Sequence, residues 1–283
     1  GQTVERQCGS SLQSINTAAA FIQADFGEVY LAGGCESWSR QPHLMERGEH
    51  PFSLMPPPWI TRTVGPTPET DVPMGMIAEI LAEEYHISRE EQDRYGLESQ
   101  ERAFRAMEAG YFTEEIVPVE IPRRKGEPVV FERDEHPRRT TLEKLASLRP
   151  AFKKDGTVTA GTSSGLNDGG VALLVMEGEK CEALGFKPLG RFVGCALSAL
   201  APKYMGIAPV GAITKVLSRT GLSLSDMGVV ECNEAFASQT LAVMKILEQE
   251  GHRVDPEKWN PNGGAIAFGH PNGMSGGRLA LAV

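Results

Sequence analysis

The chain of 283 residues is 41% hydrophobic and 23% charged, which predicts a globular protein with a core that needs neither disulfides nor a metal. Its net charge of −9 and its lack of a long apolar run argue against nucleic acid and membranes as partners. The five cysteines include no Cys-x-x-Cys pair, and no histidines stand at metal spacing, so we expect a cytoplasmic protein with free thiols and no metal site.

The chain opens with a predicted helix and a predicted strand. Apolar residues recur on one helical face over residues 9–26, and a glycine ends this helix. Residues 29–32 form a short apolar strand that we expect to break at the glycine pair 33–34. Residues 38–73 are rich in proline, with three in succession at 56–58, and predict an irregular excursion from the core.

Two helices follow the excursion, and the sequence marks their boundaries. The first covers about residues 75–86. The second begins at Ser88, where Ser-Arg-Glu-Glu forms a capping box, and it ends at Gly110. Residues 115–155 are charged and extended, and residues 171–176 form an apolar run that predicts a strand buried on both faces.

The remainder of the chain alternates strands and helices. A new unit begins after Gly185, with a predicted strand over 189–200, a helix over about 210–219, a strand over 229–231 and a helix over about 235–250. Such alternation predicts an α/β protein in which helices cover a sheet.

One segment departs from the acidic balance of the chain. Residues 120–154 hold ten Lys and Arg against six Asp and Glu. A solvated surface accounts for such a segment. The alternative is a local site for a phosphorylated ligand.

Cys8 is the first candidate for chemistry, because it directly precedes the predicted helix of residues 9–26. The free N–H groups and partial positive charge of a helix N-terminus stabilise a thiolate, so we expect the pKa of this thiol to fall. The alternative is a cysteine that is merely a small buried hydrophobe.

Two further side chains stand where ligands are commonly bound. His270 lies in the glycine-rich segment 260–273, which would hold it rigidly as a general base. A structural histidine is the alternative. Asn233 stands where a predicted strand meets a helix, a position that serves either ligand binding or simple N-capping.

A second motif favours a different reaction. Residues 161–165 read Gly-Thr-Ser-Ser-Gly, which matches the nucleophile elbow of α/β-hydrolases, and Ser163, Asp226 and His270 follow the order of a hydrolase triad. An elbow needs a buried strand before it and a helix after it. The residues before it here are polar, and those after it break on glycine and then form a strand, so we disfavour a serine hydrolase.

Four motifs together resemble the thiolase family over essentially the whole chain. They are Val-Glu-Arg-Gln-Cys-Gly-Ser-Ser at 4–11, Ala-Gly-Thr-Ser-Ser-Gly-Leu-Asn-Asp-Gly at 160–169, Asn-Glu-Ala-Phe-Ala at 233–237 and Asn-Gly-Gly-Ala-Ile-Ala-Phe-Gly-His-Pro at 262–271. The resemblance implies an α/β fold of two similar halves, each with a mixed five-stranded sheet, layered helix-sheet-helix-sheet-helix. It also implies an inserted loop domain that covers CoA.

The resemblance divides the chain into three parts. Residues 1–37 and 167–187 correspond to the N-terminal half, residues 38–166 to the loop domain and residues 188–283 to the C-terminal half. Both halves are expected to be incomplete. The first strands of the N-terminal half and a C-terminal Cys-x-Gly loop with a second reactive cysteine are missing from the printed chain, so we expect a chain truncated at both ends.

The resemblance also implies an activity. A thiolase is an acyltransferase of fatty acid metabolism, including β-oxidation, that performs thiolysis of 3-ketoacyl-CoA or the reverse Claisen condensation through an acyl-cysteine. Its substrates are CoA and acyl-CoA, with no other cofactor, and it forms homodimers or homotetramers. Cys8 matches the nucleophile and His270 its base. Asn233 matches the residue that fixes a water in the oxyanion site.

Four more residues match family contacts to CoA. Ser164 matches the contact to the pantetheine arm, and Met74 and Phe236 match the apolar walls of its tunnel. Arg138 matches the arginine near the adenosine phosphate across an alignment gap. Pro73 stands where many biosynthetic members have a histidine, which favours a degradative enzyme.

Two alternatives remain beside the complete enzyme. A protein of thiolase fold that binds acyl-CoA, or acts as a scaffold without full turnover, fits a chain that lacks the second cysteine. The serine hydrolase is the third hypothesis. Ketoacyl synthases share the fold but pair their cysteine with two histidines, and no suitable second histidine occurs in this sequence.

Overall fold

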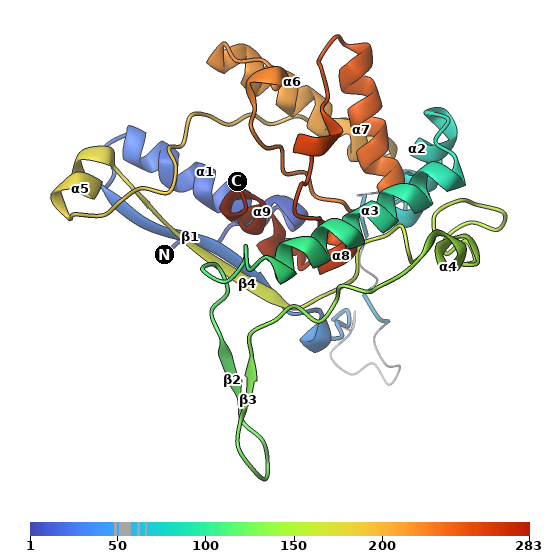
Figure 1. Cartoon of the computed structure of the whole chain (residues 1–283), viewed down its shortest axis with the longest axis horizontal. Coiled ribbons are helices and arrows are strands. Elements are labelled where there is room, and N and C mark those ends of the chain that lie inside the picture. Colours follow the sequence, from blue (N-terminus) through green and yellow to red (C-terminus); the bar gives the residue numbers. More distant parts are fainter. Residues whose placement is uncertain (48–49, 51–57, 61–62, 66) are drawn as a thin grey trace.

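A computed structural model gives the fold, and the structure describes residues 1–47, 50, 58–60, 63–65 and 67–283. The prolines at 56 and 57 lie outside the described residues. Two strands, β1 (Val29–Glu36) and β4 (Gly169–Met176), pair antiparallel, and two helices, α1 (Ser10–Gln23) and α9 (Asn272–Leu281), pack together against this pair (Figure 1). Segments from opposite ends of the sequence therefore lie side by side.

The β1–β4 pair is buried on one face. Ala32 packs there against Ile15 and Ala18 of α1, whereas Leu174 on the other face is 54% exposed. The expectation that residues 171–176 are buried on both faces is therefore wrong. An apolar run does not reveal how many layers cover its strand, and α1 and α9 cover only one side.

The glycine pair 33–34 does not break β1, which continues to Glu36. A Cβ atom on Gly34 would lie 2.0 Å from the carbonyl oxygen of Gly273 near the start of α9. One on Gly33 would lie 2.2 Å from the carbonyl oxygen of Val171 on β4. These glycines thus permit close backbone approach rather than ending the strand.

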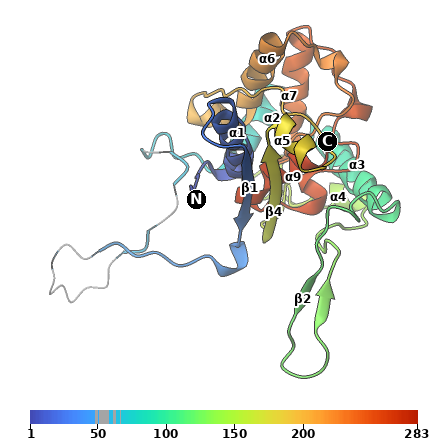
Figure 2. The same cartoon turned by 90° about the vertical axis from the view of Figure 1, so that its left-hand side faces the viewer.

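The middle of the chain is built on two helices, α2 (Met74–Glu84) and α3 (Arg89–Glu108). The predicted capping box at Ser88 is confirmed, since Ser88 and Glu91 each bond the other's backbone N–H. A hairpin of β2 (Val119–Ile121) and β3 (Val129–Phe131) projects from the body, as Figures 1 and 2 show. The segment predicted to be extended also contains a short helix, α4 (Leu142–Ala146), capped by the side chain of Thr141.

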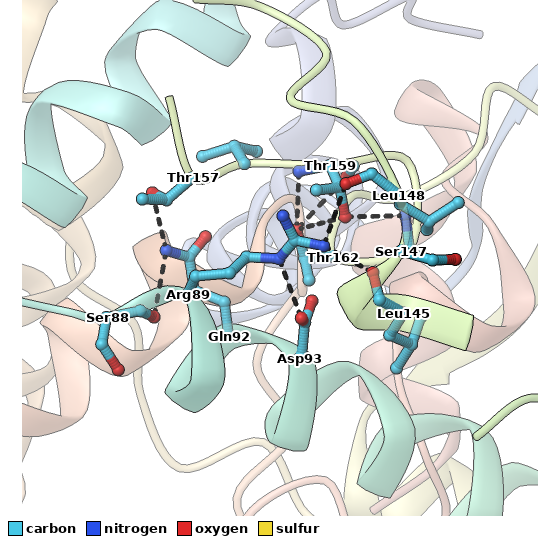
Figure 3. Close-up of polar contacts among 12 residues, drawn as sticks. Ser88, Arg89, Gln92, Asp93, Leu145, Ser147, Leu148, Thr157, Thr159 and Thr162 are labelled. Carbon is cyan, nitrogen blue, oxygen red and sulfur yellow. Dashed lines mark hydrogen bonds and ion pairs between the residues drawn. The ribbon is translucent and has the colours of Figure 1, made fainter. Parts of the chain in front are cut away.

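The start of α3 anchors the chain at Leu145, Leu148 and Thr157, as Figure 3 shows. The guanidinium of Arg89 donates to the carbonyl oxygens of Leu145 and Leu148 and pairs with Asp93 at 2.8 Å. Nearby, the Gln92 amide donates to the Thr157 hydroxyl at 2.9 Å. These contacts fix the chain a few residues before the Ser163–Ser164 motif.

The later part of the chain is mainly helical. Its helices are α5 (Gly178–Ala183), α6 (Ala208–Thr220), α7 (Ala237–Gln249) and α8 (Ala265–Phe268), and the chain also forms 3-10 helices η1 (Gln7–Gly9), η2 (Trp38–Arg40), η3 (Pro202–Ile207), η4 (Leu224–Asp226) and η5 (Pro256–Lys258). Trp259, Val243 and Leu247 centre the core of this part. No helix among the described residues is both long and apolar enough to cross a membrane.

Two predicted strands do not form in the described structure. Residues 189–200 have no regular secondary structure, and Leu189 is 97% exposed. Residues 229–231 make a single parallel bridge, from Val230 to Trp259. A strand needs neighbours to complete its hydrogen bonds, and each sheet in the described part of the chain has only two strands.

Candidate active site

Cys8 and His270 lie side by side although 262 positions separate them in the sequence. The Nε2 atom of His270 is 2.9 Å from the Sγ atom of Cys8. Cys8 lies in η1, directly before α1, and His270 lies between α8 and α9. The ends of two packed helices therefore bring together the two residues that we singled out as nucleophile and base.

Contacts between α1 and α9 hold these helix ends together. The buried Ser11 hydroxyl donates to the carbonyl oxygen of Met274 at 2.8 Å and accepts from the N–H of Gly277 at 2.7 Å. A Cβ atom on Gly276 would lie 2.7 Å from the Cβ atom of Leu12. Because position 276 carries no side chain, the two helices approach closely enough for both hydrogen bonds to form.

The other ring nitrogen of His270 determines which tautomer faces the thiol. Nδ1 lies 2.6 Å from the Ser275 hydroxyl, which itself donates to the carbonyl oxygen of Pro271 at 3.0 Å. We therefore assign the ring proton to Nδ1, where it is donated to Ser275. Nε2 is then an acceptor, and it can take the proton of Cys8.

Burial sets the protonation of both groups. It raises the pKa of Cys8 to about 11, although the residue's own backbone N–H, which donates to the sulfur, lowers it, and Glu36 and Glu5 add smaller increases. Burial likewise lowers the pKa of His270 to about 4, helped by Arg278. The expectation that the helix N-terminus lowers the pKa of Cys8 is therefore wrong, because desolvation outweighs it. At neutral pH the pair is a thiol beside a neutral imidazole.

Asn233 joins this pair. Its Nδ2 atom lies 3.4 Å from Nε2 of His270, and its Oδ1 atom is buried without a hydrogen-bond partner among the described residues. The N-cap of α7 is Phe236, so Asn233 does not cap that helix. Three side chains from separate segments thus converge on one point, and Asn233 brings a hydrogen-bond donor to it.

The serine motif lies beside the segment that carries Asn233, and the hydroxyl of Ser163 is bonded within the motif's own part of the chain. The N–H of Ser164 donates to the carbonyl oxygen of Ala235 at 3.0 Å, so the motif pairs with the residues before α7. The N–H of His270 donates to the carbonyl oxygen of Gly165 at 2.9 Å. The Ser163 hydroxyl is buried and donates to the carbonyl oxygen of Thr159 at 2.7 Å, which occupies its only proton.

The hydrolase triad is not assembled. Asp226 lies exposed in η4, where its carboxylate accepts hydrogen bonds from the backbone and hydroxyl of Ser223. The hydrogen bonds of the His270 ring in the described structure go to Cys8, Asn233 and Ser275, and include neither Ser163 nor Asp226. The geometry therefore favours a cysteine nucleophile.

The two predicted apolar walls lie near one aromatic residue that sequence analysis missed. The rings of Phe236 and Phe152 meet edge to face with centroids 5.7 Å apart. Gly75, next to Met74, lies against the same ring, since a Cβ atom there would be 2.1 Å from it. Met74 itself packs against the core around Ile77. Nothing in the polar stretch around Phe152 marks that residue as part of a site.

Arg138 does not join these residues by any hydrogen bond or ion pair within the described structure. Its backbone N–H donates to the Gln100 side chain at 2.7 Å, and its own side chain is exposed. Two residues earlier, His136 lies 2.7 Å from the carbonyl oxygen of Ala267 in α8. The basic segment therefore passes beside the loop that carries His270, with a guanidinium that faces solvent.

Two hollows in the described structure lie elsewhere. One, of about 470 Å³, is lined by Phe112, Ile116 and Asp134 among others, and a second, of about 540 Å³, by Tyr85 and Lys215 among others. Neither is lined by Cys8, His270 or Asn233. No cluster of three metal-binding side chains occurs among the described residues.

Two polar residues that the sequence does not single out support the Cys8–His270 pair and Asn233. Ser275 orients the His270 ring, and Glu234 is a buried carboxylate next to Asn233. Both stand inside the quoted motifs or within five positions of them. The partners of Glu234 on α3 and α8 come from distant parts of the chain. Ser275 lies only five positions after His270, but no local pattern distinguishes it from an ordinary helix residue.

Comparison with known proteins identifies the family of the chain. The model "Thiolase, N-terminal domain" matches residues 1–179, and "Thiolase, C-terminal domain" matches residues 186–283. A probable acetyl-CoA acyltransferase of Staphylococcus epidermidis is 45% identical over 285 residues, and one of Staphylococcus aureus strain COL is 47% identical over 286. Each alignment covers 99% of this chain and 71% of the relative.

Solved structures give the same answer at the level of the fold. The acetyl-CoA acetyltransferase of Bacillus anthracis superimposes with a TM-score of 0.91 at 43% identity, covering 100% of this chain and 71% of that one. Human mitochondrial 3-ketoacyl-CoA thiolase in complex with CoA superimposes with a TM-score of 0.89 at 42% identity, covering 99% and 69%. Both domain models, the relatives and the fold thus agree, and the chain belongs to the thiolase family.

Proposed function

We propose that the chain transfers acyl groups from a CoA thioester through an acyl intermediate on Cys8. The observation that carries this proposal is the 2.9 Å contact between the Cys8 thiol and the acceptor nitrogen of His270. A neutral thiol beside a neutral imidazole suits a step in which the proton leaves as the new bond forms. The acetyl-CoA acyltransferase relatives support a CoA thioester as the substrate class.

In acylation, the Cys8 sulfur attacks the carbonyl carbon of the thioester and its proton moves to Nε2 of His270. The carbonyl oxygen becomes an oxyanion, which the Nδ2 group of Asn233 is placed to stabilise, directly or through a water. Collapse of this intermediate breaks the bond between carbon and the CoA sulfur. His270 then returns the proton to that sulfur, which leaves CoA as a free thiol and the acyl group on Cys8.

Thiolysis of 3-ketoacyl-CoA makes one further demand. Attack on the 3-keto carbon breaks the bond between carbons 2 and 3, and carbon 2 then needs a proton. None of the other four cysteines hydrogen-bonds His270 or the side chain of Asn233 within the described residues. The Cys232 thiol donates to the backbone carbonyl oxygen of Asn233 at 3.9 Å, and burial raises the pKa of this thiol to about 12. We therefore propose acylation of Cys8 as the half-reaction that these residues support, and retain acyl-CoA binding without full turnover as the second candidate.

We place CoA along the predicted contacts. Ser164 would meet the pantetheine arm, with Met74 and Phe236 as apolar walls, and Arg138 would meet the adenosine phosphate. The solved human relative is in complex with CoA, which supports this ligand. In this proposal residues 38–166 cover CoA. Pro73 stands directly before α2, where many biosynthetic members of the family are expected to have a histidine, and its presence fits thiolysis in fatty acid degradation.

Incubation with acetyl-CoA followed by peptide mass spectrometry tests the proposal. Acetyl groups are expected on Cys8 and absent from the remaining cysteines. His270→Ala should slow labelling by about 10²–10⁴-fold, since it removes the base. Cys35→Ser is a matched control and should leave labelling unchanged. Acetyl found only on another cysteine contradicts the assignment.

A further inference from the structure

Glu234 is a buried carboxylate beside the candidate site. It is 1% exposed and directly follows Asn233. Its Oε1 atom accepts from the Tyr95 hydroxyl at 3.0 Å and the Asn260 amide at 2.9 Å. Its Oε2 atom accepts from the Ser99 hydroxyl at 2.6 Å and the N–H of Ile266 at 3.2 Å. Four donors from three segments therefore meet on one side chain.

These donors come from α3 and from the segment that carries His270. Tyr95 and Ser99 lie on α3, and Ile266 lies in α8, four residues before His270. The Ser99 hydroxyl also accepts from the N–H of Gly264 at 3.2 Å. A Cβ atom at Gly264 would lie 2.2 Å from the carboxyl carbon of Glu234, so the loop backbone rests directly on the carboxylate.

Asn260 secures the other side of Asn233. Its Oδ1 atom accepts from the N–H of Cys232 at 2.7 Å, and its Nδ2 atom donates to the carbonyl oxygen of Cys232 at 2.9 Å as well as to Glu234. Cys232 and Glu234, on the two sides of Asn233, are thus held by one hydrogen-bonded unit, which also includes Asn260, Tyr95 and Ser99. Asn233 has little freedom to leave its place near His270.

The four donors around position 234 require a carboxylate there, because they need two oxygens that both accept hydrogen bonds. Both oxygens act only as acceptors, and each takes two hydrogen bonds. Burial raises the pKa of Tyr95 well above its ordinary value, with the Glu234 charge adding to the effect, so the phenol keeps the proton that it donates. A glutamine would turn an amide N–H toward donors that need an acceptor.

We propose that Glu234 is a positioning residue for acyl transfer, which fixes Asn233 and the loop that leads to His270 against α3. Glu234 itself makes no hydrogen bond to Cys8, His270 or the Asn233 side chain in the described structure, so it acts through the residues that it holds. The inference rests on the proposed roles of Asn233 and His270. It adds that α3, within the segment proposed to cover CoA, sets the geometry of the reacting groups.

The test compares rates of acetyl transfer to Cys8 in the 283-residue chain at saturating acetyl-CoA, measured by quenched-flow mass spectrometry. Tyr95→Phe removes one donor without changing shape and should slow the first-order rate by about 3- to 10-fold. Glu234→Gln should slow it by about 100-fold, the effect of misplacing reacting groups by about 1 Å. Tyr204→Phe is the matched control, since it removes another 3.0 Å tyrosine–glutamate hydrogen bond, to Glu84 on the surface.

The labelled fraction separates positioning from folding. Positioning lowers the rate while the final fraction of acetylated Cys8 stays that of the wild type. A lower fraction with an unchanged rate indicates a merely structural role and overturns the inference, as does a Tyr95→Phe rate equal to that of Tyr204→Phe. If Glu234→Gln does not fold, Tyr95→Phe and Ser99→Ala decide the question.

A second readout keeps the inference separate from the proposed function. Alkylation of Cys8 by iodoacetamide needs the thiol and its base but no CoA. If the wild-type chain takes no acetyl group, the proposed function fails, and alkylation then decides alone. The Glu234 and Tyr95 variants should shift the pH profile of Cys8 alkylation toward that of His270→Ala. Profiles identical to the wild type overturn the positioning role.

Discussion

Replacing Ser275 with alanine removes the hydrogen-bond partner of Nδ1 in His270, which lies 2.6 Å from the serine hydroxyl. Ser275 is 1% exposed and His270 5% exposed, so water has little access to replace the lost partner. A buried donor without a partner costs about 1–3 kcal/mol. The ring avoids this cost by moving its proton to Nε2, but Nε2 then no longer accepts the proton of Cys8.

The same free energy sets the expected change in rate. If the productive tautomer becomes less favourable by about 1–3 kcal/mol, acylation of Cys8 slows by about 5- to 150-fold. Single-turnover labelling with acetyl-CoA measures this rate. Ser238→Ala is the matched control, because Ser238 is equally buried and its hydroxyl donates to the carbonyl oxygen of Ala78 at 2.9 Å, outside the site. Equal acylation rates in the two variants would refute the reasoning about the tautomer.

Three other predictions follow from burial and capping. Because burial raises the pKa of Cys8 to about 11, its alkylation by iodoacetamide should keep rising with pH above 9, and a plateau near neutral pH contradicts this. Burial raises the pKa of Glu231 to about 7, so its protonated form stabilises the fold fully below pH 4.5 and this contribution is lost as the pH rises through 7. Glu231→Gln should therefore raise the free energy of unfolding by about 1–3 kcal/mol at pH 8 but not at pH 4, as urea titrations would reveal. Ser88→Ala should lower that free energy by about 0.5–2 kcal/mol through loss of the cap, and an unchanged urea midpoint speaks against a contribution from the capping box.

Local signals predicted the helices better than the strands. The capping box at Ser88 and the glycine at 110 placed α3 almost to the residue, because helix ends are determined by neighbouring side chains and backbone. Residues 189–200 and 229–231 have strand-like composition, but a strand exists only with a partner, and partners lie far away in the sequence. The one-sided burial of residues 171–176 eluded the sequence for the same reason.

Some features of the candidate site could likewise be predicted from the sequence, and others could not. The motifs predicted that Cys8, Asn233 and His270 matter, and the structure brings these three side chains together. The direction of the pKa change at Cys8 was wrong, because helix position is visible in a sequence whereas desolvation is not. The Glu234 contacts depend on the folded arrangement of α3 and α8, which no single motif contains. Ser275 contacts His270 from only five positions away, but a serine in the first turn of a helix is too common to mark a site.

The long separation between Cys8 and His270 has a consequence for synthesis of the protein. The two residues stand 262 positions apart, which at about 5–20 residues per second corresponds to about 13–50 s of translation. Throughout this interval the nascent chain carries a thiol without its base, and α1 without the helix that packs against it. The Cys8–His270 pair can therefore assemble only after residue 270 has been synthesised, whichever parts of the chain have folded before.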